Sequence, residues 1–136
     1  MKANAGGEFR ADILAYFESL RIKDGPYGRY RYAASGTRPV AYASAYSAMA
    51  RHMLGNLDAV SARQKKEWAD HILSFQDEDG FFREQALAHP GSWYVPPHMD
   101  WCGWWHMSCH AIIGLAALGA RAWALAAAKA ETLEEM

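Results

Sequence analysis

WHMSCHAIIGLAALG at residues 105–119 and AYASAYSAMARHMLG at residues 41–55 are the two runs that decide the fold. They align at an offset of 64 residues, which places Ser108 on Ser44 and Gly119 on Gly55. Each run is rich in apolar and small residues, is poor in charge and ends in glycine, so each predicts a largely buried helix with a glycine C-cap. Self-similarity at a fixed period indicates a helical-repeat architecture.

An amphipathic helix is expected before each buried helix. Residues 8–21 place Phe9, Ile13 and Leu20 at helical spacing with charged residues between them. Before the second buried run, Trp68 and Ile72 belong to a similar stripe, and SARQ at residues 61–64 matches a capping box. A long loop follows each amphipathic helix, at residues 22–37 and 81–100, so both loops should lie at the same end of the molecule.

The order of these elements predicts an all-α fold of antiparallel helical hairpins in a single domain, residues 1–136. The first hairpin covers residues 8–55 and the second covers residues 60–119. Its inner helix, at about 101–118, is apolar nearly all round and is therefore expected to be buried. A helix-forming segment at residues 120–136 begins a third hairpin, which gives about two and a half hairpins in all.

The segment SFQDEDGFF at residues 74–82, followed by a buried helix that ends in LAALG, resembles the α/α-toroid superfamily. Gln76, Asp79 and Gly80 fit the Gln-x-x-Asp-Gly-x-aromatic motif of terpenoid cyclases and protein prenyltransferases. The resemblance implies a partial α/α toroid and an enzyme domain that acts on a terpenoid or prenyl substrate. Two alternatives stay open: a toroid-type carbohydrate lyase or hydrolase, and a non-catalytic helical-repeat module that binds a partner.

Four ring side chains are the candidate catalytic residues, because a toroid enzyme has its active site in the centre lined by the inner helices. The same offset aligns Tyr42 with His106 and Tyr46 with His110. Histidine acts as a general acid or base near neutral pH, and tyrosine can assist it. The alternative is that these amphipathic rings fill gaps between the inner helices, each with one polar atom satisfied.

The loop end supplies the candidate substrate-binding residues. Flat aromatic rings suit sugars, carbocations and prenyl chains, and five of them lie in or beside the second loop: Trp93, Tyr94, Trp101, Trp104 and Trp105. Arg29, Arg31 and Arg38 precede the second helix, where arginines at a helix N-terminus favour phosphate or carboxylate. Acidic residues of the second loop, Glu84 among them, stand beside its aromatic rings. The alternative is a solvated loop held by its own aromatic residues.

Zinc is the candidate cofactor. Protein prenyltransferases bind catalytic zinc with Asp, Cys and His, and Asp100, Cys102 and His106 resemble that set. The competing interpretation is that the cysteines are small buried residues and the histidines form structural hydrogen bonds.

Composition and charge restrict the partners. The net charge is −1, which argues against nucleic acid. Polar residues interrupt the apolar run at 101–120, so no membrane span is expected. Two cysteines and a start without an apolar targeting core predict a cytoplasmic protein. The open flank formed by residues 101–136 predicts a homodimer that buries the helix-forming segment at residues 120–136, and the alternative is that this segment folds back on its own chain.

Overall fold

The computed structural model describes residues 5–84 and 103–122. In these two ranges the chain forms four α-helices, one short 3-10 helix and no strand. The elements are α1 (Ala5–Leu20), α2 (Ala41–Met53), η1 (Leu57–Ala59), α3 (Ala62–Leu73) and α4 (Trp104–Ala117). The predicted all-α class is therefore confirmed for the described part of the chain. None of its helices has the length and hydropathy needed to cross a bilayer.

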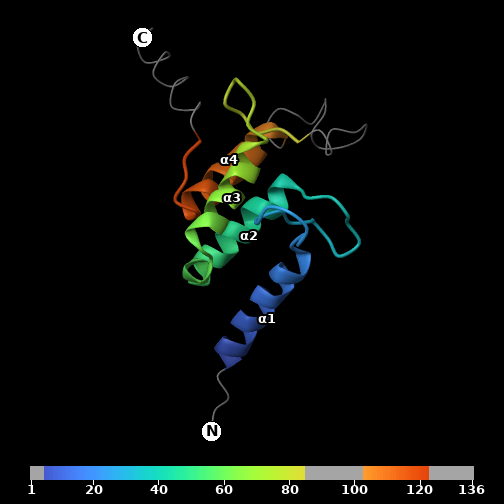
Figure 1. The fold of residues 1–136 in the computed structure, drawn as a ribbon, viewed down its shortest axis with the longest axis vertical. Coiled ribbons are helices and arrows are strands. Elements are labelled where there is room, and N and C mark those ends of the chain that lie inside the picture. Colours follow the sequence, from blue (N-terminus) through green and yellow to red (C-terminus); the bar gives the residue numbers. More distant parts are fainter. Residues whose placement is uncertain (1–4, 85–102, 123–136) are drawn as a thin grey trace.

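The helices α2, α3 and α4 pack together, whereas α1 projects away from this group (Figure 1). The main contact joins the two inner helices α2 and α4, as the repeat predicts. The helices approach closely at Gly114, because a Cβ atom at this position would lie 3.0 Å from Ala45 Cα and 3.2 Å from Ala45 O. Trp68 of α3, with no exposed surface, lies in the core of the same group.

Replacing Gly114 by valine should force α2 and α4 apart. We expect the free energy of unfolding to fall by about 2–3 kcal/mol, because overpacking at a backbone contact outweighs the better helix propensity of the new residue. Urea denaturation measures the change. Gly6→Ala in α1 is the control, because a Cβ atom there meets nothing within 4 Å. A Gly114 variant as stable as the wild type would show that the two helices are not in tight contact.

The repeat seen in the sequence recurs in the hydrogen bonding. The hydroxyl of Ser44 on α2 accepts a bond of 3.2 Å from the backbone N–H of Tyr30. At the equivalent position on α4, the hydroxyl of Ser108 accepts a bond of 2.8 Å from the backbone N–H of Phe82. Tyr30 and Phe82 have no exposed surface. Each inner helix therefore uses the same serine to hold a buried aromatic residue of the loop that precedes it.

The loops that precede α2 and α4 also begin alike. Each contains a glycine with positive φ two residues before its buried aromatic residue: Gly28 at 94° and Gly80 at 86°. An isolated antiparallel bridge then pairs Arg21 with Tyr30, and another pairs Gln76 with Phe82. The Gln76 side chain donates to the carbonyl of Gly80. The glutamine and glycine of the QDEDGFF motif thus close a turn in this structure.

Two helix boundaries differ from the sequence predictions for a local reason. Pro39 suits the first turn of this helix, but the N–H of Val40 donates to the carbonyl of Tyr30 and keeps residue 40 extended, so α2 begins at Ala41. The N–H of Ile22 bonds to the carbonyl of Arg29, which draws the chain after Leu20 out of α1. Both changes come from contacts within the first long loop that periodicity does not reveal.

Two helices expose apolar side chains that the sequence predicts to be buried. On α4, Ile113 is 50% exposed and Ile112 is 36% exposed, so the expectation of burial nearly all round is wrong for one face. On α1, Phe9 is 67% exposed and Tyr16 is 58% exposed. In both cases no other element among the described residues covers that side of the helix.

The anchors of α1 are polar and lie against the end of α2. Arg51 is 7% exposed and pairs with Glu18 at 2.8 Å. Arg10 donates to the carbonyl of Leu54 at 2.7 Å. Leu20 at the C-terminal end of α1 joins the apolar core, and the guanidinium groups of Arg51 and Arg10 hold the rest of the helix.

Candidate functional site

Four ring side chains meet where α2 and α4 pack. Tyr42 and Tyr46 lie one turn apart on α2, and His106 and His110 lie one turn apart on α4. The hydroxyl of Tyr42 is 2.8 Å from Nδ1 of His106. The ring centroids of Tyr46 and His110 are 5.0 Å apart in an edge-on arrangement. The structure thus brings together all four residues that the 64-residue offset predicts to share a wall; we call them the Tyr–His cluster.

Hydrogen bonds hold both imidazoles at the same ring atom. Nδ1 of His110 donates to the carbonyl oxygen of His106 at 2.8 Å, because a carbonyl can only accept. In its neutral form His110 therefore has the lone pair on Nε2. Nδ1 of His106 is held by Tyr42, and the two imidazole centroids are 4.2 Å apart. Both Nε2 atoms are consequently the reactive positions of this pair.

The environment of the cluster favours neutral groups. Partial burial lowers the pKa of His106, and the adjacent His110 lowers it further. Burial raises the pKa of Tyr46, and Tyr32 adds to that effect. Both shifts favour the uncharged forms of His106 and Tyr46 at neutral pH.

An aromatic rim lies beside the N-terminus of α4. Phe81 is in edge-on contact with Trp104 at 4.7 Å and with Trp105 at 4.8 Å. The guanidinium of Arg83 lies 4.1 Å from the centre of the Trp104 ring. It also pairs with Asp79 at 2.7 Å, which lowers the pKa of that carboxyl. Arg83 had no predicted role, because its pairing with Asp79 arises in the turn closed by the Gln76–Phe82 bridge and not from helical spacing.

The three predicted anion-binding arginines do not converge. Arg29 donates to the carbonyl of Pro26, and Arg31 donates to the carbonyl of Ser19 at the end of α1. Arg38 instead lines a pocket of about 460 Å³ at the start of α2. That pocket also contains Phe75, Arg83 and Glu84. Local carbonyls thus hold two of the three guanidinium groups.

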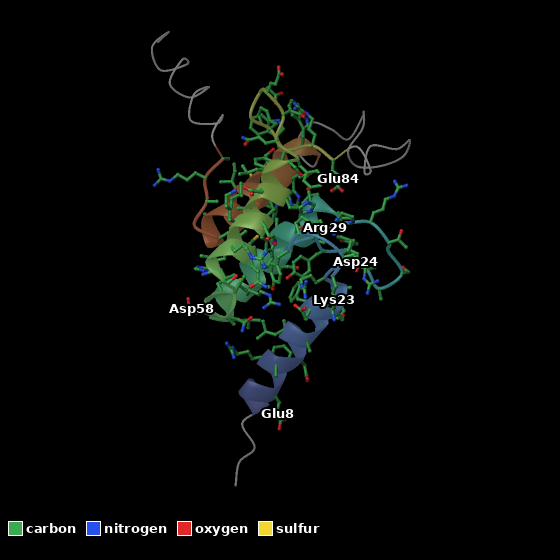
Figure 2. All side chains as sticks on the ribbon, in the orientation of Figure 1. Glu8, Lys23, Asp24, Arg29, Asp58 and Glu84 are labelled. Carbon is green, nitrogen blue, oxygen red and sulfur yellow. The ribbon has the colours of Figure 1, made fainter. Side chains whose placement is uncertain are left out.

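Glu84 occupies the N-terminus of α2, where the arginines were expected to gather an anion. It is 6% exposed, and its carboxylate accepts a 2.8 Å bond from the N–H of Ala41. Burial raises its pKa, which the bond from Ala41 partly offsets. Figure 2 shows that Glu84 lies far from Glu8, which marks the start of α1. The sequence places Glu84 among the loop acids but does not reveal this capping role.

The remaining predicted site residues lie outside the described residues: Trp93, Tyr94, Asp100, Trp101 and Cys102. Of the predicted zinc ligands, His106 alone is within the described ranges. Within those ranges no group of three or more histidine, cysteine or acidic side chains is arranged to hold a metal ion. A search against protein-family models, curated proteins and solved structures finds no match for this chain.

Proposed function

We propose that the chain is an enzyme domain of the α/α-toroid type that cleaves an acidic glycan by proton transfer at the Tyr–His cluster, as a carbohydrate lyase. The observation that carries the proposal is the pair of imidazoles 4.2 Å apart, each held at Nδ1. A neutral imidazole with its lone pair fixed on Nε2 is a competent general base. A second imidazole beside it can stabilise the charge that forms on the substrate.

The cleavage step assigns a different role to each histidine. Nε2 of His110 removes the proton from the carbon that bears the carboxyl group of a uronic acid unit. The electrons of that C–H bond form a carbon–carbon double bond as the adjacent glycosidic C–O bond breaks. The protonated His110 then returns its proton to the leaving oxygen. Negative charge develops on the carboxyl group, and one of its oxygens accepts a hydrogen bond from Nε2–H of His106. His106 carries its proton on Nε2 when the hydroxyl of Tyr42 donates to Nδ1.

The aromatic rim supplies a surface for the sugar. Trp105 is 51% exposed and is adjacent in sequence to His106. A flat indole face stacks on the apolar face of a pyranose ring, and Tyr46 packs edge-on against the proposed base. This surface favours a sugar, and the proposed elimination step requires that the sugar is a uronic acid unit with its cleaved bond near both histidines.

His110→Gln should abolish most glycan cleavage. We expect a fall in rate of about 10²–10⁴-fold, the usual contribution of a positioned base. The assay follows the absorbance of the unsaturated uronic acid product over a panel of acidic polysaccharides. Tyr42→Phe keeps the ring and removes the hydroxyl, and we expect a smaller loss together with an altered pH profile.

His52→Gln is the matched control, because His52 is an exposed histidine at the other end of α2. It should leave the rate unchanged. Hydrolysis would give products without the double bond and would assign the cluster to a glycoside hydrolase. If no acidic polysaccharide is cleaved, the lyase proposal is wrong.

A terpenoid or prenyl substrate is the second proposal, and the aromatic rim favours it. Trp104 and Trp105 contact Phe81 in a group that suits carbocations and prenyl chains. Turnover of an isoprenyl diphosphate would select this proposal over the lyase. A metal assay then separates zinc-dependent prenyl transfer, with Asp100, Cys102 and His106 as the candidate ligands, from metal-independent chemistry. Absence of turnover with both substrate classes would favour the non-catalytic repeat module.

A further inference from the structure

The two imidazoles of the Tyr–His cluster lie side by side on one helix. His106 and His110 are four residues apart on α4, and their ring centroids are 4.2 Å apart. His106 is exposed and His110 is half-buried, so solvent reaches both rings. Two histidines at this spacing on one helix face can coordinate the same zinc ion. The pair therefore has the spacing of a two-histidine metal chelate.

The hydrogen bonds at both Nδ1 atoms are of the kind that metal-binding histidines make. Such a histidine donates its other ring N–H to an oxygen acceptor, which fixes the orientation of the ring. Nδ1 of His110 donates to the carbonyl of His106 at 2.8 Å, and Nδ1 of His106 is 2.8 Å from the hydroxyl of Tyr42. A hydroxyl can accept as well as donate. When Tyr42 accepts from His106, both Nε2 atoms have a lone pair for a metal.

We infer that Nε2 of His106 and Nε2 of His110 together chelate one divalent transition-metal ion of the zinc class. Zinc–nitrogen bonds of about 2.0–2.1 Å, at ligand angles of about 90–110°, place the two ring centres about 4.5–5 Å apart. The observed separation of 4.2 Å is slightly shorter. A small rotation of the two side chains therefore completes the chelate without any change in the helix.

The ligand set determines which ions bind and how tightly. In the described residues no third histidine, cysteine or acidic side chain joins the pair, so water fills the other positions of the metal. The affinity should therefore be lower than that of a structural zinc site, which has four protein ligands. Cu²⁺ should bind more tightly than Zn²⁺, because imidazole sites follow the Irving–Williams order. Mg²⁺ and Ca²⁺ prefer oxygen ligands and should not compete.

Metal binding does not depend on the function proposed above, but it has a consequence for that function. The metal occupies Nε2 of His110, the atom that is proposed to remove the substrate proton. It also requires the tautomer of His106 opposite to the one used in the cleavage step. Zn²⁺ should therefore inhibit glycan cleavage and EDTA should restore it, a consequence that rests on the lyase proposal. Titration without substrate tests the chelate separately.

Isothermal titration calorimetry of the full chain with zinc chloride tests the chelate. We expect the wild type to bind Zn²⁺ and His110→Gln, which loses one of the two ligands, to bind more than about a hundredfold more weakly. Tyr42→Phe removes only the hydrogen bond to His106 and should weaken binding about tenfold, as loss of an outer hydrogen bond does. His52→Gln, at an exposed histidine on the other end of α2, is the matched control and should bind as the wild type does.

Cys102→Ser distinguishes this chelate from the zinc set that the prenyltransferase resemblance implies. That set requires Cys102 and not His110, whereas the chelate requires His110 and not Cys102. We therefore expect Cys102→Ser to bind Zn²⁺ like the wild type. Circular dichroism checks that each variant is folded, and His106→Gln at the exposed ligand replaces His110→Gln if that variant does not fold. Absence of zinc binding by the wild type, binding that survives loss of either histidine, or binding lost in Cys102→Ser would overturn the inference.

Discussion

Gly28→Ala is expected to lower the free energy of unfolding by about 4 kcal/mol. Part of the loss is conformational, because Gly28 has a φ of 94° and a residue with a Cβ atom is strained there by about 1–2 kcal/mol. The rest is steric. A Cβ atom at this position would lie 2.2 Å from Cγ of Trp68, which has no exposed surface. Overpacking of this kind typically costs about 1–3 kcal/mol and occasionally more.

The indole of Trp68 has little freedom to move aside for the new methyl group. Its Nε1–H donates to the carbonyl of Ser44, and its ring lies 5.1 Å from the Tyr30 ring. Gly55→Ala is the matched control, because Gly55 has a φ of 60° but nothing within 4 Å of a Cβ atom. Urea denaturation of both variants separates dihedral strain from the clash. Equal losses would show that Trp68 can yield.

Acidification should destabilise the protein through His71. Burial, together with the nearby Arg29, lowers the pKa of His71 to about 4. The folded state therefore binds fewer protons than the unfolded state between pH 4 and the ordinary histidine value of about 6.5. The stability that neutral His71 contributes to the folded state is fully present above a pH of about 6.5 and is lost as the pH falls toward 4. The loss amounts to about 3 kcal/mol.

His71→Leu should remove this part of the acid sensitivity. The free energy of unfolding, measured from pH 4 to pH 7, should fall less steeply in the variant than in the wild type. Leucine also fits the site, because Nε2 of His71 is buried without a hydrogen-bond partner among the described residues. His52→Leu, at an exposed histidine, serves as the reference and should retain the wild-type slope. Parallel slopes for His71→Leu and the wild type would contradict the assignment.

Local sequence signals correctly predicted three helix boundaries: the start of α3 and the ends of α2 and α4. The capping box forms, with Ser61 accepting from the N–H of Gln64 and Gln64 accepting from the N–H of Ser61. Gly55 and Gly119 follow α2 and α4 with positive φ, as a glycine C-cap requires. These features are short-range, so the residues that form them are close together in the sequence.

The meeting of Tyr42 with His106 was also predictable, although the two lie far apart in the chain. Two helices that repeat at a fixed offset and pack side by side place equivalent residues on one wall. The hydrogen bond from the N–H of Ala41 to Glu84 was not predictable in this way. Glu84 lies in a loop, and a loop has no periodic pattern that would indicate which helix end it contacts. Nor could periodicity distinguish a helix that is buried on all sides from α4, which has one apolar face that is exposed.

The attachment of α1 has a consequence for the dynamics of the fold. Apart from Leu20 at its C-terminal end, α1 is held mainly by the Arg51–Glu18 pair and by Arg10, so we expect salt and charge to govern the docking of its remaining length more than apolar burial does. Detachment of α1 should leave the packing of α2 on α4 intact. Such a segment opens sub-globally, at a lower free energy than the cooperative unit formed by the other three helices. We therefore expect two free energies of opening: a lower one for the detachment of α1 and a higher one for the cooperative unfolding of α2, α3 and α4.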